Sequence, residues 1–147
     1  MDIGSLDKKH RLLFLCTGNS ARSQMAEAIV NNKLGEEWVA FSAGTQPASR
    51  VNPLAVRALA EIGINHLGTP KIIDQFRNQP FDLVITLCDD AAQNCPVWLG
   101  QGKRMHIGFP DPAEATGSDE EKMMVFRSVQ EDIQARILPV LVEFQNR

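Results

Sequence analysis

The stretch from Cys16 to Ser23 constrains the fold of this chain more than any other. It follows a continuous apolar run at residues 12–15, which is typical of a strand covered on both faces, and it precedes a helix-like segment at 24–30. Five residues between Cys16 and Arg22 allow a tight loop whose backbone N–H groups converge on one point above the positive end of the helix. The guanidinium of Arg22 suits a tetrahedral oxyanion, and the same field favours the thiolate of Cys16. We therefore predict an oxyanion site with a nucleophilic thiol.

The rest of the sequence alternates strand-like and helix-like segments. Strands are predicted at residues 12–16, 38–44, 81–88 and 104–107, and helices at 21–34, 53–62, 71–77 and 119–146. Asn52 is expected to cap the second helix, Ser118 and Glu121 to form a capping box on the last one, and Pro139 to kink or divide that helix. This alternation predicts an α/β fold.

The short connections imply one domain with a four-stranded parallel sheet and helices on both faces. We expect residues 1–10 to be a polar lead-in and residues 11–147 to form a single catalytic domain. Cys16, Cys88 and the loop after Ile107 all follow predicted strands. Because the carboxyl ends of parallel strands share one edge, these segments should meet there.

Composition excludes several classes of function. The net charge of -3 and the pI near 5.6 disfavour a nucleic-acid or anionic-membrane surface. No apolar stretch approaches the roughly 20 residues of a membrane span, and residues 1–10 lack the apolar region of a signal peptide. Three cysteines are too few for a secreted disulfide scaffold and suggest reactive thiols in a reducing compartment. We expect a cytoplasmic monomer with no membrane or nucleic-acid partner.

The loop sequence Cys-Thr-Gly-Asn-Ser-Ala-Arg-Ser, followed by Gln-Met-Ala-Glu, resembles the phosphate-binding loop of the low-molecular-weight protein tyrosine phosphatases and of the related thioredoxin-coupled arsenate reductases. The resemblance implies that Cys16 is the nucleophile and that Ser23 donates to its thiolate. It also implies that the oxyanion is held by Arg22 and by the backbone of Thr17, Gly18, Asn19, Ser20 and Ala21. The simpler alternative is a buried cysteine near a strand end and a surface arginine.

A second motif is Phe-Pro-Asp-Pro at residues 109–112. Resemblance to the family's late Asp-Pro pair makes Asp111 the general acid that protonates the leaving oxygen. Taken alone, an Asp-Pro pair is as well explained by a solvated turn. Its combination with the anion loop favours the catalytic interpretation.

Two further cysteines, Cys88 and Cys95, distinguish the reductases from the plain phosphatases. By resemblance, Cys88 attacks the arsenylated Cys16, arsenite leaves, and a Cys16–Cys88 disulfide forms; Cys95 then attacks Cys88, and thioredoxin reduces the resulting disulfide. Alternatively, Cys88 is a buried strand-end thiol and Cys95 a loop cysteine. A zinc site is disfavoured because no Cys-x2-Cys pair is present.

The spacing of this second pair adds a physical constraint. Seven residues of helix span roughly 10.5 Å, whereas a disulfide needs Cα atoms within about 7 Å. A helical 88–95 segment therefore cannot close the bond. Either it is a loop in the reduced protein or it unwinds on oxidation, and Pro96 already biases Cys95 away from helical angles.

The sequence also departs from the family pattern. Ala21 stands where a second loop cysteine is common, and the chain has no tyrosine and no aromatic residue soon after Asp111, which favours a small inorganic oxyanion over an aryl phosphate. Some of these reductases bind potassium through residues that match Asn19, Glu27, Ser42 and an aspartate. Lys71 stands near the aspartate position, so its ammonium group is a candidate replacement for the ion. The three histidines have no evident acid–base partner in the sequence.

We therefore predict an arsenate reductase that uses thioredoxin, needs no cofactor or resident metal, and binds arsenate in competition with phosphate or sulfate. Two alternatives remain: a low-molecular-weight tyrosine phosphatase, and a non-catalytic module that senses oxyanions or arsenite through its thiols. Some phosphatase activity is expected in either enzyme because the loop chemistry is shared. Glutaredoxin or mycothiol in place of thioredoxin also stays open.

Overall fold

Strand β1 (His10–Cys16) occupies the centre of a sheet of four parallel strands in the computed structural model, which describes residues 8–88 and 98–146. The strand order is β2-β1-β3-β4. The other three strands are β2 (Trp38–Gly44), β3 (Leu83–Thr86) and β4 (Lys103–His106). The predicted parallel sheet is confirmed. β1 starts two residues earlier than predicted, and β3 is shorter than the predicted 81–88.

The described part of the chain contains three α-helices: α2 (Arg22–Lys33), α3 (Pro53–Ala60) and α4 (Asp119–Gln145). The side chain of Asn52 accepts a hydrogen bond of 2.9 Å from the N–H of Leu54, which confirms the predicted cap of α3. The capping box at Ser118 is confirmed as well. α4 continues through Pro139 to its end, so Pro139 does not divide this helix, and the alternative of a kink stays a prediction. The predicted helix at 71–77 is only the short 3-10 helix η1 (Ile73–Phe76), and η2 (Pro112–Glu114) is a second one.

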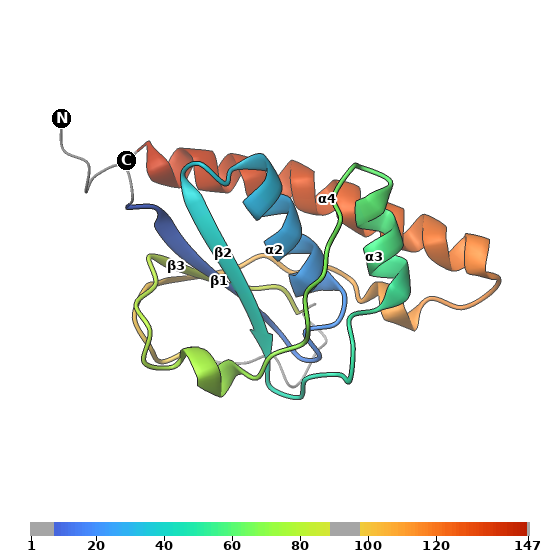
Figure 1. Ribbon diagram of the computed structural model, residues 1–147, viewed down its shortest axis with the longest axis horizontal. Coiled ribbons are helices and arrows are strands. Elements are labelled where there is room, and N and C mark those ends of the chain that lie inside the picture. The colour runs from blue at the N-terminus through green and yellow to red at the C-terminus, as the bar shows by residue number, and fades with distance from the viewer. Residues whose placement is uncertain (1–7, 89–97, 147) are drawn as a thin grey trace.

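Alternate side chains of β1 pack on opposite faces of the sheet. Leu12 and Phe14 belong to the larger core, together with buried residues of α2, α3 and α4. Helix α4 packs across both α2 and α3 (Figure 1). Leu13 and Leu15 belong to the second core, on the other face of the sheet. This core also contains residues of η1 and an aromatic cluster. This cluster consists of Phe41, Phe76, Phe81 and Trp98. β1 is therefore covered on both faces, as its apolar run predicts.

The carboxyl ends of β1, β2 and β3 meet at one edge of the sheet. The backbone N–H of Leu87, just beyond β3, donates to the carbonyl of Leu15, and the N–H of Phe109 donates to the carbonyl of Leu87. The loops that carry Cys16, Cys88 and Asp111 therefore start side by side. No helix in the described parts of the chain is long and apolar enough to span a membrane.

Candidate active site at the loop after β1

The loop between β1 and α2 is held from outside by the segment that follows β2. Three loop carbonyls accept hydrogen bonds of 2.9 Å from backbone N–H groups of that segment: Thr17 from Gln46, Gly18 from Ala48, and Ser20 from Asn52. The C=O and N–H of a planar trans peptide point in opposite directions. The N–H groups of Gly18, Asn19 and Ala21 are therefore turned away from this segment, and none of them donates to a described residue.

β2 comes close to this loop because it ends in glycine. A Cβ atom on Gly44 would lie 2.3 Å from the carbonyl oxygen of Thr17. Any other residue would push the loop and the strand apart. The Ser-Ala-Gly sequence at the end of β2 thus helps to fix the loop against the sheet.

Helix α2 begins at the loop with an uncapped N-terminus. Ala21, at its N-cap position, provides no side-chain hydrogen bond, and the first turn contains no acidic residue. The first N–H groups of a helix need acceptors, and their partial positive charge attracts an anion. This end of α2 is therefore suited to an oxyanion, as the sequence predicts.

The thiol of Cys16 lies at the base of this site within a buried polar cluster. Its Sγ is 2.8 Å from Oγ of Ser23, and that oxygen accepts a hydrogen bond of 2.7 Å from Nδ2 of Asn19. Ser23 and Asn19 are completely buried, and Asn19 has a left-handed backbone with φ of 50°. This geometry agrees with the expected role of Ser23 as a hydrogen-bond donor to the thiolate.

Arg22 and Asp111 close the opposite side of the site. Arg22 is buried; its Nη1 donates to the carbonyl of Phe109 at 3.2 Å, and its Nη2 lies 3.7 Å from Oδ2 of Asp111. The other Asp111 oxygen accepts from the N–H of Ala113, at the start of η2. The structure thus places Asp111 within reach of the loop, where the sequence expects the general acid.

Together these groups enclose a cavity of about 60 Å³. Its lining contains most of the predicted site residues: Cys16, Gly18, Asn19, Ser20, Ala21, Arg22, Asp111 and Ala113. Thr17 is not among them. Among the described lining residues, the side chain next to Asp111 is the methyl group of Ala113 and not an aromatic ring.

Cys88 lies at the same sheet edge as Cys16. It follows Leu87, whose N–H is bonded to the residue before Cys16, and its side chain is fully buried. Cys95 lies outside the described residues. On the neighbouring strands, Oγ1 of Thr86 is 2.7 Å from Nδ1 of His106, so this histidine has a partner that the sequence did not suggest.

The residues that match a potassium site form a cluster around Glu27. Its Oε1 accepts from the hydroxyl of Ser42 at 2.9 Å and lies 3.7 Å from Nζ of Lys71. The side-chain oxygen of Asn19 accepts from the backbone N–H of Lys71 at 2.8 Å. An ammonium group therefore already faces the carboxylate, and the residues present do not fit a potassium ion.

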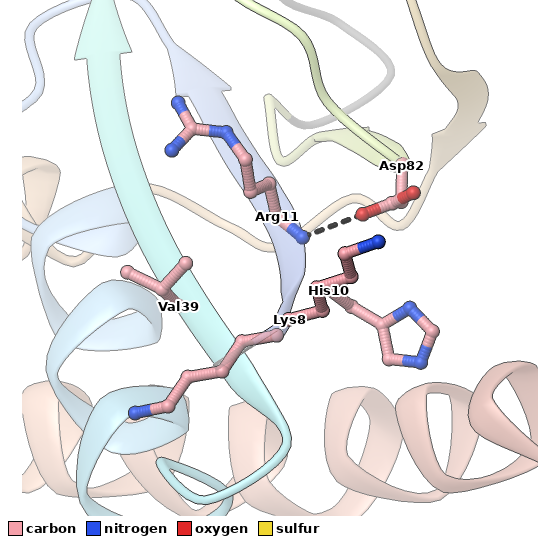
Figure 2. A pocket seen from close by; sticks show the side chains of 6 residues that line it. Lys8, His10, Arg11, Val39 and Asp82 are labelled. Carbon is pink, nitrogen blue, oxygen red and sulfur yellow. Dashed lines mark hydrogen bonds between the residues drawn. The ribbon is translucent and has the colours of Figure 1, made fainter. Parts of the chain in front are cut away.

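A larger hollow of about 570 Å³ lies at the opposite end of β1 and is lined mainly by basic residues. Its polar groups are not arranged around one point as those around Cys16 are. Figure 2 shows that the charged ends of Lys8 and Arg11 lie apart. The guanidinium of Arg11 is held by Pro80 and Gln79, and its backbone N–H by Asp82. These groups do not converge on a ligand, so the site at Cys16 is the candidate active site.

Two features of the site were missed in the sequence. Gln24 and His66 extend the hydrogen bonds of Asn19. Arg136 of α4 donates to the carbonyl of Gly108 at 2.9 Å and lies over the ring of Phe109, next to the Asp111 loop. These contacts join segments that are far apart in the sequence, so no local sequence motif predicts them.

Comparison with known proteins agrees with this site. The family model for low molecular weight phosphotyrosine protein phosphatase matches residues 11–146. An arsenate reductase of Halalkalibacterium halodurans is 52% identical over 130 residues, covering 88% of this chain and 93% of that protein. An arsenate reductase of Bacillus subtilis is 48% identical over 127 residues, covering 86% and 91%.

A solved structure described as an arsenate reductase in the phosphate binding state superimposes with a TM-score of 0.76 at 28% identity. The match covers 91% of this chain and 98% of the other. The loop, the fold and these matches agree over nearly the whole length of the protein. The chain therefore belongs to the low molecular weight phosphotyrosine protein phosphatase family.

Proposed function

We propose that this chain is an arsenate reductase that converts arsenate to arsenite. The observation that carries the proposal is the small cavity of about 60 Å³ that Cys16 lines, where Ala113 is the described residue beside Asp111. A tetrahedral oxyanion matches this space, whereas an aryl group would find no aromatic side chain to pack against among the lining residues. The relatives named arsenate reductase support the same substrate.

The first step uses the loop as a binding site for the oxyanion. Arsenate is held by the backbone N–H groups of the loop and by Arg22, and phosphate or sulfate competes for the same groups. The thiolate of Cys16 attacks arsenic and displaces one oxygen. Asp111 gives that oxygen a proton, so it leaves as water. The product is arsenate bonded to sulfur.

The second step reduces arsenic. The thiolate of Cys88 attacks Sγ of Cys16, the sulfur–arsenic bond breaks, and its electron pair stays on arsenic, which leaves as arsenite. Cys95 then attacks Cys88 and releases the Cys16 thiolate. Thioredoxin, the reductant implied by the family resemblance, supplies two electrons to the Cys88–Cys95 disulfide. The position of Cys88 beside β1 supports the start of this relay.

A phosphatase is the second candidate function, because the family loop is shared and phosphate has the same shape as arsenate. Hydrolysis needs only Cys16, Arg22, Asp111 and water. We infer some activity on small aryl phosphates but no preference for phosphotyrosine, since the methyl group of Ala113 cannot pack against the aromatic ring as an aromatic side chain would. A thiol-based sensor without turnover is the remaining alternative. A cytoplasmic location and a monomeric state stay predictions.

Assays of arsenate-dependent NADPH oxidation with thioredoxin and thioredoxin reductase test the proposal. The native chain should turn over steadily, and Cys88→Ser and Cys95→Ser should each stop after one turnover at most. Hydrolysis of p-nitrophenyl phosphate, measured in parallel, shows whether the loop of each variant is intact. Cys16→Ser should abolish both reactions.

The outcomes separate the candidates. Native-like arsenate turnover in both Cys88→Ser and Cys95→Ser would refute the relay. Phosphate-ester hydrolysis without any arsenate reduction would identify a phosphatase, and absence of both activities in a folded protein would favour the sensor. Replacing thioredoxin by glutaredoxin or by mycothiol with its own reductase identifies the reductant.

A further inference from the structure

A continuous series of hydrogen bonds leads from Cys16 to His66, which belongs to the segment between α3 and η1. Ser23 and Asn19 form its first two members, as described above. Nε2 of Gln24 then donates to both oxygens of Asn19, the carbonyl and Oδ1, each at 3.1 Å. Finally, Oε1 of Gln24 lies 2.6 Å from Nε2 of His66. Gln24 is completely buried and His66 is half-buried.

Backbone groups fix the orientation of the two side-chain amides in the series. The backbone N–H of Lys71 can only donate, and it binds Oδ1 of Asn19, so the amide nitrogen of Asn19 must face Ser23. The carbonyl of Thr69 can only accept, and it binds the Gln24 nitrogen at 3.0 Å. Oε1 of Gln24 must therefore face His66.

It follows that His66 donates from Nε2 and that Ser23, whose oxygen already accepts from Asn19, has its own proton available for Cys16. Burial lowers the pKa of His66; the neighbouring Lys71 lowers it further, and Glu27 opposes them. The neutral imidazole is therefore the main form near pH 7, and it can donate from only one nitrogen. That nitrogen is the one that faces Gln24.

The contact between His66 and Gln24 depends on the absence of a side chain at Gly68. A Cβ atom on Gly68 would lie 2.5 Å from Nε2 of His66 and 2.6 Å from Oε1 of Gln24. Only glycine leaves room for the imidazole to reach the amide. The position of His66 therefore depends on Gly68, although neither residue lines the cavity.

We propose that His66 and Gln24 are positioning residues that keep Ser23 directed at the Cys16 thiolate. His66 holds the Gln24 amide, Gln24 and Lys71 hold Asn19 in its left-handed conformation, and Asn19 leaves Ser23 as the donor to sulfur. The inference rests on the proposed function only in taking Cys16 as the nucleophile. It adds a segment remote from the loop to the control of thiolate reactivity.

The test measures the Cys16 thiolate directly, without arsenate. In a chain that carries Cys88→Ser and Cys95→Ser, Cys16 is the only thiol, and its alkylation by iodoacetamide is followed against pH. His66→Met removes the donor at similar length, His66→Gln keeps an N–H at that distance, and Gly68→Ala displaces an intact histidine. Thermal unfolding establishes that each variant is folded.

His66→Met and Gly68→Ala should each move the midpoint of alkylation upward by about half a pH unit, roughly a threefold loss of thiolate below the midpoint. His66→Gln should stay close to the native profile. A native profile in folded His66→Met, or an equal shift in His66→Gln, overturns the proposal. If His66→Met does not fold, Gly68→Ala against His66→Gln decides in the same way. Because arsenate is absent from this assay, failure of the proposed reduction would leave its outcome unaffected.

Discussion

Lys71 brings a positive charge to Glu27 from outside the loop. Its Nζ lies 3.7 Å from the carboxylate and 3.0 Å from the carbonyl of Thr69, in a partly buried position. We propose that this ammonium group takes the place of the potassium ion that the family resemblance implies at this position. The charge that stabilises the back of the loop is then covalently attached and needs no ion from solution.

Titration with potassium should therefore change neither the melting temperature nor the turnover of the native chain. Lys71→Asp removes the ammonium and adds a carboxylate, so its melting temperature should rise with potassium by mass action. Sodium at equal ionic strength is the control for screening. A response of the native chain to potassium but not to sodium would contradict the proposed replacement.

The residues of the site that could be predicted either lie together in the sequence or belong to motifs of the family resemblance, as Asp111 and Cys88 do. Cys16, Arg22 and Ser23 lie within one stretch of eight residues between the first strand and the first helix, so their placement indicates the oxyanion site, and the family resemblance adds the role of Ser23. The partners that orient them come from distant segments: His66 reaches Gln24, and the Phe109 carbonyl reaches Arg22. Such contacts depend on tertiary packing, which local periodicity does not encode.

At the scale of single elements, α4 begins with a reciprocal cap. Oγ of Ser118 accepts from the N–H of Glu121 at 3.2 Å, and Oε1 of Glu121 accepts from the N–H of Ser118 at 3.0 Å. Ser118→Ala should lower the free energy of unfolding by about 1 kcal/mol, and Ser118→Gly by only a few tenths. Urea denaturation at pH 7 measures both; equal midpoints for native, Ala and Gly chains would show that the cap contributes nothing.

Element boundaries were predictable where a cap or a glycine marks them and less so where only apolar character does. Asn52 and Ser118 begin their helices as expected. The predicted strand at 81–88 is shorter because Phe81 is buried outside the paired residues of β3 and joins the aromatic cluster on the second face instead. Hydrophobicity reports that a residue is buried, but not whether its backbone has a neighbouring strand.

At the scale of the whole molecule, the free energy of unfolding should fall in acid over two pH ranges, one set by His66 and one by two glutamates. Burial lowers the pKa of His66 in the folded chain, so the unfolded chain binds its proton first. The free energy of unfolding should then fall as pH drops from about 6.5 to the lowered pKa of His66, and this contribution should not change further below it.

The second range belongs to two exposed glutamates. A hydrogen bond from Arg127 lowers the pKa of Glu61, and hydrogen bonds from Ser118 lower that of Glu121. Their contributions are present above the ordinary glutamate pKa of 4.5 and are lost as pH falls through the lowered values.

Urea denaturation from pH 8 to pH 3 should separate the two ranges, because His66→Gln removes only the first. In that variant the free energy of unfolding should vary less than in the native chain as the pH falls below about 6.5, while the loss below 4.5 remains. An identical slope in native and His66→Gln chains across the upper range would show that His66 has the same pKa folded and unfolded. The neutral imidazole that faces Gln24 would then not be favoured by the fold, and the cluster behind Cys16 would bind the proton without loss of stability.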